Sequence, residues 1–195
     1  MTPSTSPSAL RSLAIFFALR GVGATPSHCP SSDDPTVLDE AWLECRTKQI
    51  LQGCLEPIIS RIKGNASFVF TPDASHSYGA QWTRDFYYIV SGAADLLDRD
   101  LVMNSIRFTF SGQRPDGCMP DRVQTDGKSV YSPGAPPGFA DHAWDNGPFA
   151  ALLLAAASAA WPDAAQRTNF FCELEPRARA ALSFVNRSST SHLVW

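Results

Sequence analysis

Residues 81–88 read Gln-Trp-Thr-Arg-Asp-Phe-Tyr-Tyr, which places an adjacent arginine and aspartate among four aromatic side chains. From Phe86 to Leu97 apolar residues recur at the spacing of a helix with one buried face, so a helix is predicted to begin here. Charges beside large aromatic rings are costly to bury unless each has a partner. A sugar can supply such partners, because its hydroxyls bond to Arg84 and Asp85 while its ring stacks on aromatic faces.

Apolar periodicity predicts further helices along the chain, over residues 37–54, 101–110, 149–160 and 174–185. The helices at 86–97 and 101–110 are joined by a tight turn and must pack antiparallel, and 149–185 is predicted to form a second hairpin. Residues 111–143 contain many glycines, prolines and aspartates and predict a long ordered loop with a small β-hairpin through 125–128. A short strand is expected at 68–70.

A second polar cluster precedes the third helix, at residues 141–149 (Asp-His-Ala-Trp-Asp-Asn-Gly-Pro-Phe). Structural roles compete with functional ones here. Aspartates and asparagines before a helix can be caps, an arginine can form a structural ion pair, and tryptophans can be core residues. These alternatives apply to Asp85, Asp145 and Asn146, to Arg84, Asp121 and Arg122, and to Trp82 and Trp144. His142 alone is expected to be structural.

Composition limits the classes of function. The 195 residues suit one domain, and a net charge of −3 with no basic run argues against nucleic-acid binding. The five cysteines lack metal-site spacing, so no zinc site is expected. In an oxidising compartment Cys29 would pair with Cys45 or Cys54, and the alternative is that several cysteines are simply buried thiols.

The N-terminus indicates secretion. Residues 1–24 combine an arginine, a short apolar run and small residues before a cleavage site after Ala24, which predicts a signal peptide. A disordered leader or transit peptide is the alternative. Residues 25–35 then form a linker to a domain at 36–195, and the sequons at Asn65 and Asn186 suit a secreted glycoprotein. No other apolar stretch reaches the ~18 residues of a membrane span.

Four motifs in order resemble the six-hairpin glycosidase superfamily, the (α/α)6-toroid enzymes that include glucoamylase-like, trehalase-like and mannosidase-like members. They are Trp-Thr-Arg-Asp at 82–85, Arg-Pro-Asp-Gly-Cys-Met-Pro-Asp-Arg at 114–122, Trp-Asp-Asn-Gly-Pro-Phe at 144–149 and Leu-Val-Trp at 193–195. The resemblance covers residues 36–195 and implies an all-α fold of antiparallel helical hairpins.

The resemblance also implies the site. Asp145 is the first choice for the general acid, with Asp141 as the second. The substrate, a carbohydrate, would be bound by residues from two helix starts and the long loop: Trp82, Arg84, Asp85, Asp121, Arg122, Trp144 and Asn146. No metal or organic cofactor is implied.

A closed toroid needs about twice as many helices as this chain predicts, and the general base of the later hairpins has no counterpart here. We therefore expect an incomplete (α/α)6 toroid with a long ordered loop, part of a hydrolase that cleaves an O-glycosidic bond. The alternatives are a non-catalytic carbohydrate-binding or structural remnant and, more weakly, a polysaccharide lyase or epimerase. Exposed apolar helix faces would then favour self-association.

Overall fold

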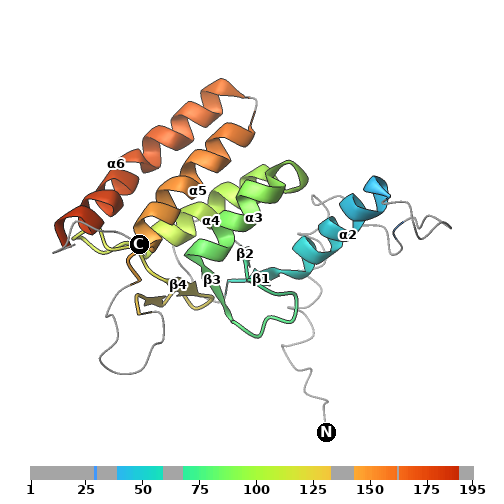
Figure 1. Cartoon of the computed structure of the whole chain (residues 1–195), viewed down its shortest axis with the longest axis horizontal. Coiled ribbons are helices and arrows are strands. Elements are labelled where there is room, and N and C mark those ends of the chain that lie inside the picture. Colours follow the sequence, from blue (N-terminus) through green and yellow to red (C-terminus); the bar gives the residue numbers. More distant parts are fainter. Residues whose placement is uncertain (1–28, 30–38, 59–67, 133–142, 162, 189–195) are drawn as a thin grey trace, which may run out of the picture. The chain divides into compact units, whose positions relative to one another are not determined.

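The computed structural model describes residue 29 and residues 39–58, 68–132, 143–161 and 163–188 (Figure 1). Chain contacts divide it into two units, residues 1–46 and 47–195, which are described separately. Several predictions fall outside the described residues: the signal peptide at 1–24, the linker at 25–35, the sequon at Asn65, the terminal motif at 193–195, and the site residues Asp141 and His142.

The prediction of an all-α fold is wrong. Strand β1 (Leu55–Pro57) pairs antiparallel with β2 (Phe68–Phe70), and β3 (Ala80–Trp82), β4 (Arg122–Gln124) and β5 (Ser129–Val130) form a second antiparallel sheet. The described chain is therefore mixed α and β, and its description as an incomplete helical toroid is wrong too. These strands are two or three residues long, too short to show the alternation that predicts a strand.

Two of the local strand predictions are confirmed. Residues 68–70 form β2, and β4 and β5 form the hairpin expected through 125–128. Gly127 has a φ of 87°, and Asp126 accepts a hydrogen bond from the Lys128 N–H at 2.8 Å. An aspartate followed by a glycine favours a tight turn, because both tolerate the backbone conformations that it requires.

Both helices predicted for the first hairpin are present, but each packs mainly against other elements. Helix α3 (Thr83–Ala93) is followed by the 3-10 turn η2 (Ala94–Leu96) and by α4 (Arg99–Ser111). The side chain of Asp98 caps α4 by accepting a hydrogen bond from the Leu101 N–H at 2.8 Å. This cap ends the connection between the two helices.

The second hairpin is also present, with a longer final helix than predicted. Helix α5 (Asn146–Ala160) is followed by α6 (Ala164–Ser188), which begins ten residues before the predicted start at 174. Asp163 caps α6 by accepting a hydrogen bond from the Gln166 N–H at 3.0 Å. The first turns of α6 carry polar, exposed residues, and apolar periodicity cannot detect them.

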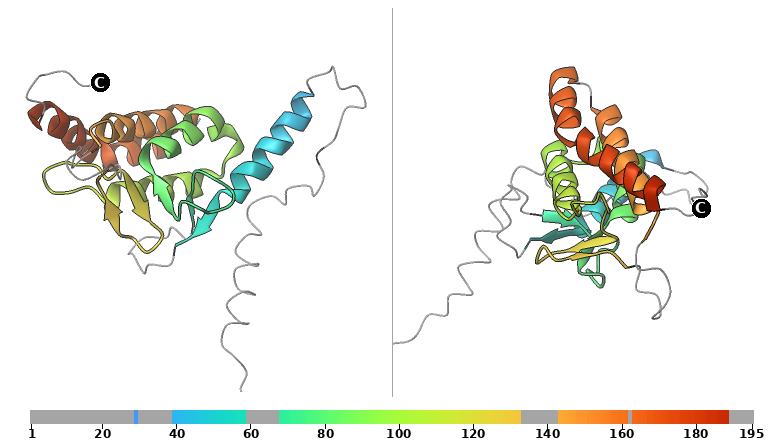
Figure 2. Two further views of the ribbon diagram at one scale, coloured as in Figure 1. Left: turned by 60° about the horizontal axis from the view of Figure 1, so that its bottom comes forward. Right: turned by 90° about the vertical axis from the view of Figure 1, so that its left-hand side faces the viewer.

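The core of the second unit lies among its helices. Helix α5 lies beside α6 on one side and beside α3 on the other, and the strands β3 to β5 lie below the helices in the left view (Figure 2). Its largest fully buried side chains include Phe70, Phe86, Ile106, Phe110 and Leu153. Gln81 is fully buried among them. It accepts a hydrogen bond from the Phe70 N–H at 3.0 Å and donates to the Ser105 carbonyl at 2.8 Å and to the Thr109 hydroxyl.

The first unit contains a disulfide that joins Cys29 to Cys45, one of the two pairings expected. Cys45 lies in helix α2 (Glu40–Gly53), which Asp39 caps by accepting from the Ala41 N–H at 3.0 Å. Cys54, the other predicted partner, is a buried free thiol, and burial raises its pKa. Within the described residues, no helix has both the length and the apolar character that crossing a membrane would require.

Candidate functional site

Two of the predicted segments are fixed side by side by the second sheet. The pairing of β3 with β4 places Trp82 opposite Arg122. Thr83, the first residue of α3, donates its N–H to the Asp121 carbonyl at 2.9 Å and its hydroxyl to the Pro120 carbonyl at 2.8 Å. Both groups of Thr83 are thereby satisfied in a buried position, and the start of α3 is attached to the start of β4.

Arg122 and Trp82 form a cross-strand pair. The guanidinium carbon of Arg122 lies 4.5 Å from the centroid of the indole, a cation–π arrangement, and its Nη1 lies 2.8 Å from Asp121 Oδ2. The rings of Trp82 and Tyr78 also pack nearly perpendicular to each other, 5.7 Å apart between centroids. Arg122 therefore covers part of the indole that the sequence assigned to stacking on a sugar. The buried indole N–H of Trp82 donates to no acceptor within the described part of the chain.

Asp121 is the buried carboxylate of the site, with 8% of its surface exposed. Burial raises its pKa above the ordinary value of 3.8, and the negative charge of Asp145 adds to this. Hydrogen bonds from Arg122 and Asn146 oppose the rise. The Nδ2 of Asn146, at the start of α5, lies 3.5 Å from Asp121 Oδ1, which brings the third predicted segment to the other two.

Arg84 and Asp145 join the beginnings of α3 and α5. The Nη1 of Arg84 lies 3.1 Å from Asp145 Oδ2, and 54% and 34% of the two side chains are exposed. A pair this accessible contributes about 0–1 kcal/mol to stability. Its two charges are instead available to a ligand at the end of the helices.

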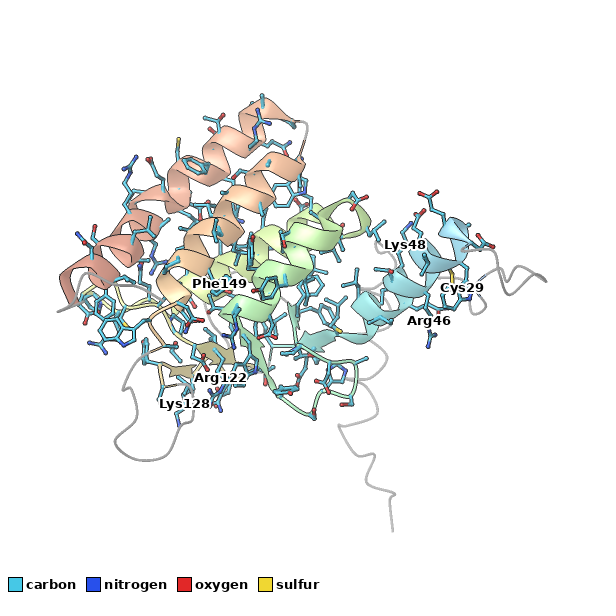
Figure 3. All side chains as sticks on the ribbon, viewed as in Figure 1. Cys29, Arg46, Lys48, Arg122, Lys128 and Phe149 are labelled. Atoms are coloured by element: carbon cyan, nitrogen blue, oxygen red, sulfur yellow. A yellow bond between two sulfur atoms is a disulfide. The ribbon has the colours of Figure 1, made fainter. Side chains whose placement is uncertain are left out.

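Most of the predicted site residues therefore come together. We call this group the acid–arginine cluster: Trp82, Arg84, Asp121, Arg122, Asp145 and Asn146 (Arg122 is labelled in Figure 3). Asp85 lies half-buried in the first turn of α3 and forms no ion pair with any described residue. Trp144 stacks on Phe184 of α6 at 5.8 Å between centroids. The structure thus gives Trp144 a partner on α6.

Three aromatic residues beside the cluster were not assigned to the glycosidase site. The rings of Tyr87, Tyr88 and Phe149 contact one another where α3 and α5 run together. A signal for them was present in the sequence. Tyr88 lies four residues after Arg84, and Phe149 lies four residues after Asp145, which is the spacing of neighbours on one helix face.

The chain was compared with protein-family models, with curated proteins and with solved structures. None of the three comparisons finds a match. Among the described residues, no group of three or more His, Cys, Asp or Glu side chains is placed to hold a metal ion. A functional proposal must therefore rest on the cluster itself.

The raised pKa of Asp121 predicts how pH changes stability. The Asp121 carboxyl binds its proton more tightly in the folded protein than in the unfolded chain. Protonation of Asp121 therefore contributes fully to the free energy of unfolding below pH 3.8, and this contribution is lost as pH rises through the folded-state pKa. We expect the free energy of unfolding of the wild type, minus that of Asp121→Asn, to be smaller at about pH 7 than at about pH 4. Chemical denaturation at both pH values measures this difference. A difference that stays constant or grows with pH would contradict the assignment.

Proposed function

We propose that the acid–arginine cluster binds a neutral pyranoside and that the protein is a glycoside hydrolase that cleaves an O-glycosidic bond by acid–base catalysis. The observation that carries the proposal is the meeting of two carboxylates, two guanidiniums and an amide at the starts of α3, β4 and α5. These groups come from residues 84, 121–122 and 145–146.

The cluster suits the hydroxyls of a sugar. Carboxylates accept hydrogen bonds from hydroxyls, guanidiniums donate to them, and bonds to charged groups are stronger than neutral ones. Arg84 and Asp145 are accessible enough to exchange part of their mutual contact for such bonds. Trp82 supports this arrangement by holding Arg122 against its ring.

The burial of Asp121 favours this residue as the proton donor. Glycoside hydrolysis needs one carboxylic acid that protonates the leaving oxygen and, on the other side of the bond, a second carboxylate. A raised pKa keeps a carboxyl protonated to higher pH, which suits the first role. The sequence favoured Asp145 as the acid. Its ion pair with Arg84 suits a role in holding hydroxyls.

Carbohydrate binding without hydrolysis is the second candidate. It is favoured by the fact that each carboxylate in the cluster already faces an arginine, Asp121 with Arg122 and Asp145 with Arg84. Such pairs bind hydroxyls well but leave no free carboxylate to activate water. The two candidates share the binding site and differ only in turnover.

Binding measurements test the proposal. We expect titration calorimetry to detect binding of at least one of the methyl glycosides of glucose, galactose and mannose. Asp145→Asn should weaken that binding about 10- to 100-fold, because hydrogen bonds to charged groups contribute about 1.5–3 kcal/mol. Glu173→Gln is the matched control, since it breaks an exposed ion pair with Arg107 between α4 and α6 and should leave affinity unchanged.

Hydrolysis separates the two candidates. If the protein releases nitrophenol from an aryl glycoside of the bound sugar, and Asp121→Asn abolishes release while binding persists, the hydrolase reading holds. Binding without release supports the second candidate. A folded protein that binds none of the three glycosides would contradict both.

A further inference from the structure

An exposed aromatic group lies beside the acid–arginine cluster. Tyr87 and Tyr88 are 5.3 Å apart between ring centroids, and Phe149 lies 5.4 Å from Tyr87 and 5.7 Å from Tyr88. We call these three residues the aromatic cluster. More than half of Tyr88, 57%, is exposed.

The aromatic cluster lies one helical turn from the Arg84–Asp145 pair. On α3 Tyr88 follows Arg84 by four residues, and on α5 Phe149 follows Asp145 by four, a step of about 6 Å along the axis that returns to the same face. On both helices the aromatic contact comes four residues after the ion pair, so α3 and α5 run parallel. We call the line of contact between these two helices the seam. Phe149, labelled in Figure 3, lies on this seam beside α3.

The aromatic cluster also supplies an accessible aromatic ring, which the acid–arginine cluster lacks. A pyranose has hydroxyls at its rim and an apolar face of C–H groups. That apolar face stacks on an aromatic ring, and the ring must be accessible. Arg122 lies over the Trp82 ring, and the Trp144 ring stacks on Phe184. Tyr88, by contrast, exposes a ring that also carries a hydroxyl.

The chemistry of the seam selects a sugar over an apolar partner. A purely apolar ligand lying on Tyr88 would offer no hydrogen bonds to Arg84 and Asp145, which are partly exposed one turn away. A chain of sugar units bonds to those charges with one unit and stacks on the tyrosine with the next. We propose that the aromatic cluster binds a second sugar unit of the same oligosaccharide. This proposal rests on the proposed function.

Comparing monosaccharide and disaccharide affinities tests this second subsite. The probes are the methyl glycoside that binds best and disaccharides of the same sugar, titrated by calorimetry. We expect at least one disaccharide to bind about tenfold tighter than the monosaccharide, as one aromatic stacking contact allows. Tyr88→Ala should remove this gain and leave monosaccharide affinity unchanged, whereas Tyr88→Phe should keep most of the gain.

Phe171→Ala is the matched control, because Phe171 is a partly exposed ring on α6 outside both clusters. It should change neither affinity, and circular dichroism confirms that each variant is folded. If disaccharides bind no tighter than the monosaccharide, or Tyr88→Ala weakens both equally, the subsite is refuted and the proposed function stands. If no sugar binds at all, both proposals fall.

Discussion

Replacing Gln81 by leucine is expected to lower the free energy of unfolding by about 2–4 kcal/mol. Gln81 is fully buried, and its amide joins three elements: it accepts from Phe70 in β2 and donates to Ser105 and Thr109 in α4. Leucine fits the volume but removes these bonds and leaves the Phe70 N–H without that acceptor. A buried donor left unsatisfied costs about 1–3 kcal/mol, in addition to the bonds lost.

Gln124→Leu is the control for this prediction. Gln124 lies on the neighbouring strand β4, opposite Ala80, and is only half-buried. Its substitution should change stability by less than about 0.5 kcal/mol. Urea denaturation of both variants measures the difference, and equal losses would show that the Gln81 network does not hold β2 and α4 together.

Replacing Gly117 by alanine is expected to lower the free energy of unfolding by about 2–4 kcal/mol. Gly117 has a φ of 97°, a conformation that side-chain-bearing residues rarely adopt. An added Cβ would also collide with the backbone carbonyl of Ala180 in α6, whose carbon would lie 2.9 Å away. The loop that contains Gly117 leads directly to Asp121, so the substitution should also weaken the proposed sugar binding.

Two other glycines separate the causes of this loss. Gly79 has a φ of 53° but open space at its Cβ, so Gly79→Ala should cost only the backbone strain, about 1–2 kcal/mol. Gly92 lies in α3 with open space, and Gly92→Ala should stabilise by about 0.5–1 kcal/mol. Thermal unfolding of the three alanine variants measures the order of their stabilities. A loss at Gly117 no larger than that at Gly79 would exclude the clash with α6.

The helices could be predicted from the sequence because their signals are local. Apolar spacing and caps such as Asp98 lie within a few residues of the helices that they define. The strand β2 and the β4–β5 hairpin also had local signals. The pairing of β3 with β4 could not be predicted, because it joins short strands across about forty residues of chain. The error in the fold class therefore comes from pairing over long distance.

The residue types of the candidate site could be predicted, but their arrangement could not. Arg84, Asp121 and Asp145 were identified as charged groups near helix starts and by resemblance to glycosidases. Their partners depend on tertiary contacts. The pairing of β3 with β4 sets Arg122 over Trp82, and the parallel packing of α3 and α5 brings Asp145 to Arg84. The sequence indicates neither.

Pro176 divides α6 into two segments with different neighbours. Proline has no amide hydrogen to donate to the carbonyl of Cys172, so the hydrogen-bond ladder is interrupted there. Before this gap, Glu173 contacts Arg107 of α4. After it, the helix lies against the Gly117 loop and the start of α5. The first segment therefore braces α4, whereas the second braces the loop that leads to Asp121 and the first turn of α5, which carries Asn146.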